Sequence, residues 1–412
     1  MKKAPISVAQ VFDEYEKRFA RVKLEKPFCP PVTDEQKNNV IDGVKKMLCF
    51  SDHLIPAITN GKVVSERDHG EYVEYQVTYQ TWKNVYGVST VMIPKTDRPV
   101  PVVLILCGHG KSGRLTESYS LMAHRLAKSK TAVIVPDNIG QGDREFMGHW
   151  KTLSPFYTGL TLQGLIVAET IALIRAIKAH TKFDEQNICA CGNSGGGTLT
   201  LFLTALAPEL KAVAISGYPS EFSYVLSKEK VHCACNLFKC GKNSMEMWEI
   251  LSLFAPKPML LSQGKNDDLI PKPLAQKNAR KVKSVYALLG AQENFRFELT
   301  DTKHPWAEED RALISEFLCK QLNLAPCKKF VEQDVIPLLE NRSVKLPSQS
   351  IDVDRLVFTI TGKAIPDGLT LQDVFPPTFK GERIDVTDLT DLEDGLDVMR
   401  IFAQMEFALK QI

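Results

Sequence analysis

A short, glycine-flanked serine segment is the part of this sequence that most clearly predicts chemistry. Gly192-Asn193-Ser194-Gly195-Gly196 fits the G-x-S-x-G pattern, in which a sharp turn between a strand and a helix presents one serine hydroxyl. Glycines suit that turn because neighbouring Cβ atoms would clash across it. The apolar run at 187–191 and the helical pattern at 198–207 supply the required context. Ser194 is therefore the predicted nucleophile.

A serine hydroxyl needs a base that removes its proton, and the base needs a group that orients it. After such a turn, the acid and then the histidine follow along the chain, in loops after later strands. His304 is the only histidine beyond the strand that should carry the acid. Asp267 and Asp268 both follow that strand. The spacing G-x-x-D-x-x-[VI]-P favours Asp267, whereas Asp268 could cap the helix expected after Pro271.

Negative charge that develops on a reacting carbonyl oxygen requires backbone N–H groups aimed at it. Gly195, directly after the nucleophile, is expected to supply one of them. The second should come from the loop at 107–113, with Gly110 or Lys111 as the donor, because glycines allow close approach. His109 lies in the same loop but precedes the nucleophile. We therefore expect it to shape the loop rather than to act as a base.

Short apolar runs that alternate with helices indicate the sheet that positions these residues. Residues 71–79 alternate strictly between apolar and polar, and 85–93 form their antiparallel partner. Six later runs are apolar throughout and are separated by helices such as 121–128 and 161–179, which is typical of a mostly parallel sheet covered on both faces. The predicted class is α/β, with the eight-stranded layout of an α/β-hydrolase. The six runs are 102–107, 132–136, 188–191, 212–216, 259–262 and 295–299.

Three regions follow from these patterns: a helical N-terminal cover at 1–63, a catalytic domain at 64–325 and an accessory C-terminal subdomain at 326–412. The C-terminal region is punctuated by prolines and has one predicted strand at 355–360. It ends in an amphipathic helix that begins near Thr390 or Asp391. We expect this region to pack on the catalytic domain; contact between copies in a homo-oligomer is the alternative.

The composition limits the class of protein. The chain has 412 residues, of which 44% are hydrophobic and 24% charged, as in ordinary globular proteins. A net charge of +2 without a basic block argues against nucleic acid or an anionic membrane as a main partner. The start shows no export signal, and no stretch of about 20 apolar residues is present. We therefore expect a cytoplasmic protein whose ten cysteines are reduced thiols.

Some further residues suggest sites without establishing them. His232, Cys233, Cys235 and Cys240 resemble zinc ligands, but they lack the paired C-x2-C spacing of structural sites, so no metal and no cofactor are expected. Residues 143–145, Asp-Arg-Glu, are expected to form an ion-pair network that braces their loop. Four aromatic residues fall in loops around the nucleophile, where they suit sugar or aryl groups as well as simple packing: Trp150, Tyr157, Tyr218 and Trp306.

Over roughly residues 65–322, the chain resembles the acetyl xylan esterase-like branch of the α/β-hydrolases, close to relatives of dienelactone hydrolase. The resemblance implies that Ser194, Asp267 and His304 form a triad that hydrolyses carboxylic esters, often of acetylated sugars. Dienelactone hydrolase itself has a cysteine nucleophile, unlike this chain. The likeness is carried by Cys107-Gly108-His109-Gly110, by 136–144, by 192–197, by His232-Cys233-Ala234-Cys235-Asn236 and by 253–258.

The predicted function is therefore that of a serine esterase acting on small acetylated carbohydrates or other small esters. Two alternatives stay open. One is a serine peptidase related to the prolyl oligopeptidases, although the residues before the catalytic domain leave no room for a propeller. The other is a catalytically silent binding protein on the same fold.

Overall fold

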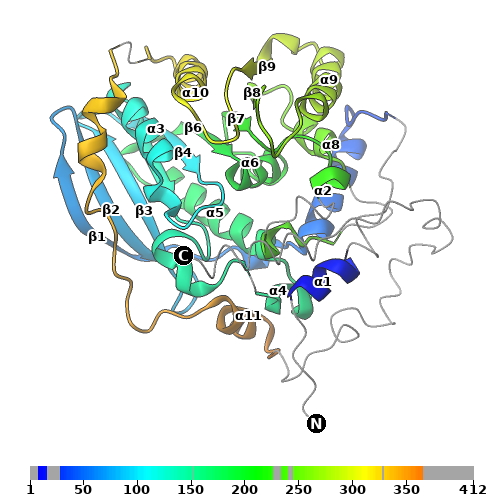
Figure 1. Cartoon of the computed structure of the whole chain (residues 1–412), viewed down its shortest axis with the longest axis horizontal. Helices are drawn as coiled ribbons and strands as arrows, with labels where there is room; N and C mark the ends of the chain where they lie inside the picture. The colour runs from blue at the N-terminus through cyan, green and yellow to red at the C-terminus, as the bar shows by residue number, and fades with distance from the viewer. Residues whose placement is uncertain are drawn as a thin grey trace.

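A single mixed sheet forms the centre of the protein (Figure 1). The computed structural model describes residues 8–15, 28–150, 152–225, 233–239, 245–326 and 329–364. The strand order is β1-β2-β3-β5-β4-β6-β7-β8-β9. In this order the pairs β1–β2, β2–β3 and β3–β5 are antiparallel, and all later pairs are parallel. The strands are β1 Thr59–Asp68, β2 Tyr72–Gln80, β3 Tyr86–Pro94, β4 Val100–Leu106, β5 Ala132–Pro136, β6 Phe183–Asn193, β7 Ala212–Ser216, β8 Met259–Gly264 and β9 Phe295–Thr300.

Helices cover both faces of the sheet, as the uniformly apolar strands require. In β4, Val103 and Ile105 pack in the same apolar cluster as α3 and α10, whereas Val102 and Leu104 belong to the cluster that contains α5 and α6. The predicted α/β class, a mostly parallel sheet with helices on both faces, is therefore confirmed. The helices are α1 Val8–Tyr15, α2 Asp34–Leu48, α3 Glu117–Lys128, α4 Ser154–Thr158, α5 Leu162–Lys178, α6 Gly195–Leu206, α7 Phe222–Val225, α8 Met247–Ser252, α9 Lys272–Leu288, α10 Glu308–Gln321 and α11 Val353–Thr361.

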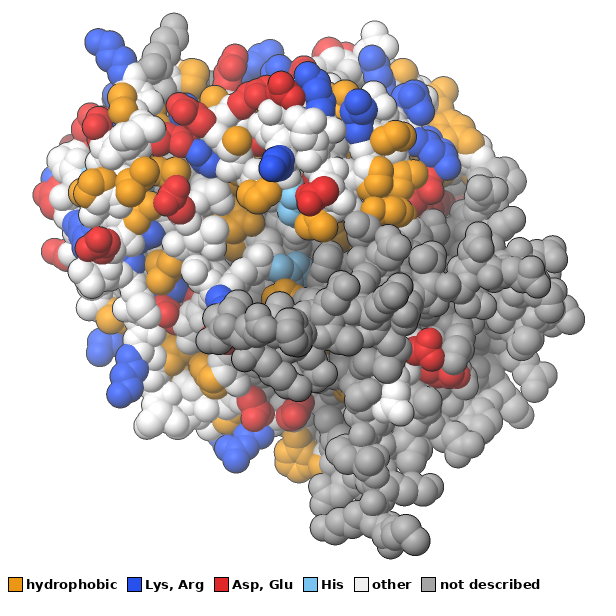
Figure 2. All heavy atoms as spheres, viewed as in Figure 1, with side chains coloured by type: hydrophobic (Ala, Val, Ile, Leu, Met, Phe, Trp, Pro, Cys, Tyr) orange, Lys and Arg blue, Asp and Glu red, His pale blue; other side chains and the backbone are white. Residues whose placement is uncertain are grey.

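Two surface properties follow from the described residues. None of their helices combines the length and the apolar composition needed to cross a bilayer. On the part of the face that Figure 2 shows in colour, basic and acidic side chains are interspersed, in agreement with the small net charge.

The sheet has nine strands rather than the predicted eight, because β1 was missed. Its residues are almost all exposed, so its sequence lacks the alternation that marks a half-buried strand. It forms the edge of the sheet beside β2. The predicted boundary between residues 63 and 64 falls inside this strand.

The C-terminal region was also predicted wrongly at 355–360, where the structure has helix α11 instead of a strand. Asp352 caps the helix by accepting a hydrogen bond from the N–H of Arg355. Val353, Leu356 and Val357 are buried on one side, and this i, i+3, i+4 spacing outweighs the β-branched composition. The amphipathic helix predicted from Thr390, and with it the possible oligomer contact, lies outside the described residues.

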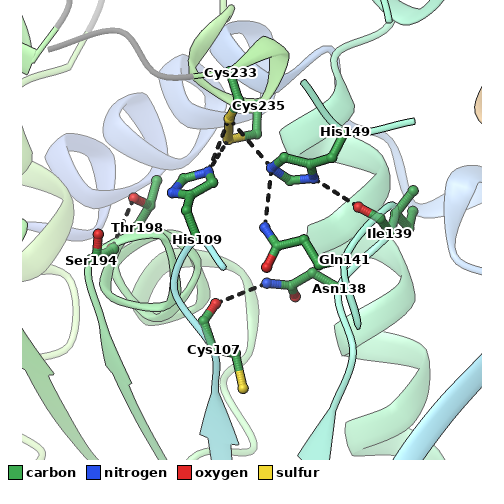
Figure 3. The surroundings of a disulfide bond; sticks show 10 residues. All are labelled: Cys107, His109, Asn138, Ile139, Gln141, His149, Ser194, Thr198, Cys233 and Cys235. Atoms are coloured by element: carbon green, nitrogen blue, oxygen red, sulfur yellow. Dashed lines mark hydrogen bonds between the residues drawn. A yellow bond between two sulfur atoms is a disulfide. The ribbon is translucent and has the colours of Figure 1, made fainter. Parts of the chain in front are cut away.

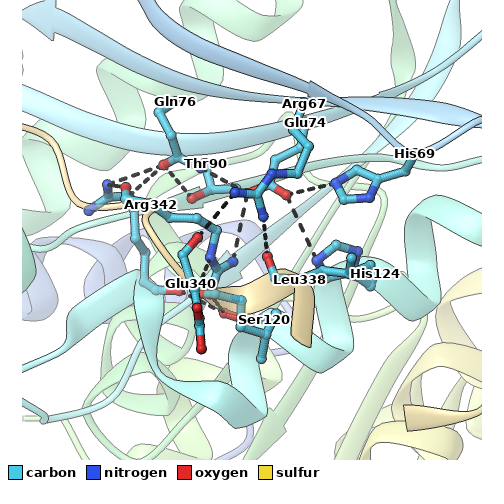
Figure 4. Close-up of polar contacts among 12 residues, drawn as sticks. Arg67, His69, Glu74, Gln76, Thr90, Ser120, His124, Leu338, Glu340 and Arg342 are labelled. Atoms are coloured by element: carbon cyan, nitrogen blue, oxygen red, sulfur yellow. Dashed lines mark hydrogen bonds and ion pairs between the residues drawn. The ribbon is translucent and has the colours of Figure 1, made fainter. Parts of the chain in front are cut away.

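Polar contacts join the C-terminal region to the sheet and to α3 (Figure 4). Arg67 donates to the carbonyl of Glu340 at 3.2 Å, and Arg342 donates to Ser120 Oγ at 2.7 Å. Arg342 also lies 3.8 Å from Glu74 Oε1. Hydrogen bonds from charged side chains therefore hold residues 338–342 against β1, β2 and α3.

His124 lies in the same cluster and makes the stability of the protein depend on pH. Its ring is fully buried, with Nδ1 2.5 Å from Tyr72 Oη, and burial lowers its pKa to about 3. The unfolded chain, with a histidine pKa of about 6.5, therefore binds more protons, and stability falls as the pH falls below that value. Between about pH 7.5 and pH 5.5, we expect His124 to remove roughly 1 kcal/mol from the free energy of unfolding. Urea unfolding at both pH values measures this change.

The matched variants are His124→Gln, whose side chain cannot be protonated, and His53→Gln at an exposed histidine. In the first variant, the free energy of unfolding should fall by about 1 kcal/mol less on acidification than in the wild type. In the second variant, it should fall as much as in the wild type. A His124→Gln variant that loses as much stability as the wild type would contradict this origin of the pH dependence.

Candidate active site

The predicted serine turn is present between β6 and α6. Ser194 has φ 57° and ψ −121°, a backbone conformation that is rare for a residue with a side chain. The two glycines around it are needed for close approach: a Cβ on Gly192 would lie 2.2 Å from the carbonyl oxygen of Gly196, and one on Gly196 would lie 1.8 Å from that of Leu106. The strand, the strained serine and the helix thus agree with the sequence prediction.

His304, in the loop after β9, pairs with Asp267, in the loop after β8. Nδ1 of His304 lies 2.9 Å from Oδ2 of Asp267. The other carboxylate oxygen, Oδ1, accepts the N–H groups of Leu269 at 2.8 Å and Ile270 at 2.9 Å. The structure therefore brings together the histidine and the first of the two candidate acids.

Asp268 does not have the capping role that was considered for it. Helix α9 begins at Lys272 with Pro271 as its N-cap residue, and no side chain caps it. Proline has no backbone N–H to satisfy at a helix start, and its fixed φ suits that position. The helix therefore begins without a cap from Asp268.

The Asp267 carboxyl is held in its charged form. Burial by itself would raise its pKa, but the hydrogen bond and the charge of His304, together with the two backbone donors, hold that pKa below its usual value. The Gln263 amide also donates to Oδ2 at 2.7 Å. A carboxylate fixed in this way orients the imidazole.

Ser194 and His304 line the same small cavity at the carboxyl ends of the strands. Its free volume of about 20 Å³ is enough for one water-sized group. Within the described part of the chain, Nε2 of His304 is enclosed and has no hydrogen-bond partner. The nitrogen that would act as the base is thus not held in a structural hydrogen bond within the described residues. The remaining lining residues are His109, Gly195, Thr198, Gly217, Tyr218, Val225, Asn236, Leu269 and Ile270.

The two loops expected to bind an oxyanion meet at this cavity. Gly195 lines it, as predicted for the first donor. From the other loop, His109 lines it, whereas Gly110 and Lys111 are not among the lining residues. The His109 ring lies close to Gly195, since a Cβ there would be 2.7 Å from Cε1 and Nδ1 of the ring. His109 thus helps to set the spacing of the two loops.

A hydrogen-bonded chain that the sequence did not reveal connects the serine turn with the histidine loop. Asn193 Nδ2 donates to the carbonyl of His304 at 3.0 Å, and Asn193 Oδ1 accepts from Ser216 Oγ at 2.9 Å. Trp306 Nε1 donates in turn to Ser216 Oγ at 2.5 Å. Asn193 occupies a variable position of the motif, so its type carried no signal. These three side chains hold the turn of Ser194 and the loop of His304 in place relative to each other.

The ion-pair network expected around residues 143–145 is confirmed for two of them. Arg144 pairs with Glu169 at 2.6 Å, and Asp143 lies 2.8 Å from Arg114. Glu145 is exposed. The network lies behind the loop after β5, where it braces the backbone.

Cys233 and Cys235 lie against His109, in the loop after β4, and form a disulfide in the structure (Figure 3). The rings of His109 and His149 both point toward them. Burial lowers the pKa of His149 to about 4, so this ring is neutral near pH 7. Two of the four residues considered for zinc, His232 and Cys240, lie outside the described residues.

Comparison with known proteins bears on the fold and on the family resemblance. The structure resembles that of the methylesterase BT1017 (17% identity, 87% of this chain and 80% of that chain, TM-score 0.65) and that of a glucuronoyl esterase from Solibacter usitatus (12%, 73% and 96%, TM-score 0.54). YtaP of Bacillus subtilis (strain 168), which is named as a hydrolase, is 24% identical over 229 residues, 51% of this chain and 75% of that protein. Residues 62–236 match the family model for acetyl xylan esterase (AXE1). The fold and the expected resemblance are thereby confirmed.

Proposed function

We propose that the protein hydrolyses carboxylic esters with Ser194 as nucleophile, His304 as general base and Asp267 as the orienting acid. The match of residues 62–236 to the acetyl xylan esterase (AXE1) family model supports the esterase class. The observation that carries this proposal is the 2.9 Å bond between His304 and Asp267 beside the cavity that Ser194 lines. All three residues follow the carboxyl ends of parallel strands, where binding sites of such sheets lie.

The reaction follows from these positions. Ser194 Oγ bonds to the acyl carbon while Nε2 of His304 takes its proton, and Asp267 stabilises the imidazolium. The N–H of Gly195 and one from residues 109–111 hold the oxyanion. When the C–O bond to the alcohol breaks, His304 returns the proton to the leaving oxygen. Water then attacks the acyl-enzyme with His304 again as base, which releases the acid and restores Ser194.

The substrate we propose is a small ester, with acetylated carbohydrates as the leading class. The free volume of about 20 Å³ beside Ser194 favours a short acyl group. The family description and the glucuronoyl esterase among the structural neighbours also favour esters of carbohydrates. The aromatic residue Tyr218 lines the cavity.

A fluorophosphonate probe combined with a substrate panel tests this function. We expect the probe to label Ser194, and p-nitrophenyl acetate to be cleaved at least about tenfold faster than the butyrate, since extra methylenes in a confined pocket cost about that much. Acetylated oligosaccharides should release acetate. Cleavage of aminoacyl arylamides but not of acetyl esters would instead establish a peptidase. An unlabelled, folded protein would establish a binding protein without catalysis.

A further inference from the structure

Four potential metal ligands converge next to the oxyanion loop (Figure 3). His109 follows β4, His149 follows the loop after β5, and Cys233 and Cys235 belong to a short segment far along the chain. Their ligand atoms all lie within 4.8 Å of one another. Nε2 of His109 lies 2.9 Å from Cys233 Sγ and 3.0 Å from Cys235 Sγ, and Nε2 of His149 lies 3.3 Å from Cys233 Sγ.

This is the donor set of a closed tetrahedral zinc site, with two imidazole nitrogens and two sulfurs. With Zn–S near 2.3 Å and Zn–N near 2.0–2.1 Å, neighbouring ligand atoms around the ion should be roughly 3.3–3.8 Å apart. A nitrogen–sulfur pair falls near the middle of that range, at about 3.5 Å. The distances of 2.9, 3.0 and 3.3 Å in the cluster would therefore each lengthen by about 0.2 to 0.6 Å around the ion. The two sulfurs would have to be separate thiolates and not the disulfide that the structure contains.

The surroundings of His149 prepare its ring for binding a metal. Nδ1 lies 2.7 Å from the carbonyl oxygen of Ile139, which can only accept, so this nitrogen carries the proton. The Gln141 amide lies 3.2 Å from Nε2, in agreement with a lone pair on that atom. A histidine that donates its other N–H to a backbone carbonyl is the usual arrangement beside a metal.

Burial and charge fit the same ion. Cys233 is fully buried, and Cys235 and His149 are at most 3% exposed. Two buried thiolates alone would carry an uncompensated charge of −2, which Zn²⁺ cancels. Because four protein ligands complete the tetrahedron, such an ion has no open position for a substrate and is structural.

We propose that Cys233 and Cys235, as thiolates, bind one Zn²⁺ together with His109 and His149. Each thiol gives its proton to solvent as its Zn–S bond forms, and no group changes its oxidation state. The ion would join residues 233–235 to the loop that lines the cavity, and would hold the His109 ring against Gly195. The ligands are distinct from the triad, since none of them is Ser194, Asp267 or His304.

Metal analysis of the full chain tests the proposal without reference to activity. Protein purified anaerobically with a thiol reductant should contain one equivalent of zinc by mass spectrometry of the metal. Co²⁺ added to the reduced, metal-free protein should produce the visible ligand-field and thiolate charge-transfer absorption of a tetrahedral site. This spectrum tests the wild type directly, even if a variant fails to fold.

Variants identify the ligands. Cys235→Ser and His149→Ala should each weaken Co²⁺ binding by at least about 100-fold. Loss of a residue that only hydrogen-bonds to a ligand lowers metal affinity by about 10- to 100-fold, and loss of the ligand itself should lower it at least as much. Cys29→Ser, at an exposed cysteine, should bind as the wild type does. Far-UV circular dichroism confirms folding, and fluorophosphonate labelling of Ser194 reports separately on the proposed function. A reduced wild type that binds no Co²⁺ would overturn the proposal. So would metal-free protein, purified without exposure to air, in which mass spectrometry finds a Cys233–Cys235 disulfide.

Discussion

Replacing Ser194 by alanine is expected to lower kcat for p-nitrophenyl acetate by about 10⁴-fold or more. Without the hydroxyl, no acyl-enzyme can form, and only the oxyanion donors and substrate binding remain to assist direct attack by water. Cβ is kept, so the turn around φ 57° and the packing of Gly192 and Gly196 are unchanged. Initial rates measured with both proteins, after the same purification, give the ratio.

Ser65→Ala is a matched control, because it removes a hydroxyl from the exposed edge strand β1. It should have wild-type activity and should still be labelled by a fluorophosphonate, whereas Ser194→Ala should not be labelled. Activity of Ser194→Ala within about tenfold of the wild type would exclude Ser194 as the nucleophile.

The strands and the serine turn could be predicted because their signals are local. Strands β2 to β9 are buried on one or both faces, so their apolar patterns follow directly from their positions. The pentad at 192–196 is contiguous and its glycines have a steric cause. Strand β1 has neither property, and α11 was predicted as a strand because composition was weighed above the spacing of its buried side chains.

The candidate site was predictable where chain order limits the choice, and not where distant segments meet. His304 was found because no other histidine follows the acid loop. The zinc hypothesis was set aside because the spacing at 232–240 is irregular, yet the histidines beside Cys233 are 84 and 124 residues away in the chain. Asn193 had no sequence signal either, since its role depends on its contacts with Ser216 and the carbonyl of His304.

The choice between two adjacent aspartates leads to the second large effect. Asp267→Asn is expected to lower kcat by roughly 10³–10⁴-fold with little change in KM. The Asn oxygen can keep the N–H groups of Leu269 and Ile270, which places the amide NH₂ toward His304 Nδ1. That nitrogen must then accept a hydrogen bond, so the proton moves to Nε2, and the ring can no longer take the proton of Ser194.

Asp268→Asn makes the same chemical change one residue further along the chain and should leave kcat within about twofold of the wild type, because the bond to His304 comes from Asp267. Asp267→Asn should also be less stable, since the amide NH₂ would face the Gln263 donor that now binds Oδ2 at 2.7 Å. Urea unfolding distinguishes this loss of stability from the loss of activity. A variant that is folded but inactive has lost the His304 tautomer that can accept a proton at Nε2, and not its structure. If Asp268→Asn were the inactive variant, His304 would depend on the other carboxylate during turnover, and the 2.9 Å pair would belong only to the resting enzyme.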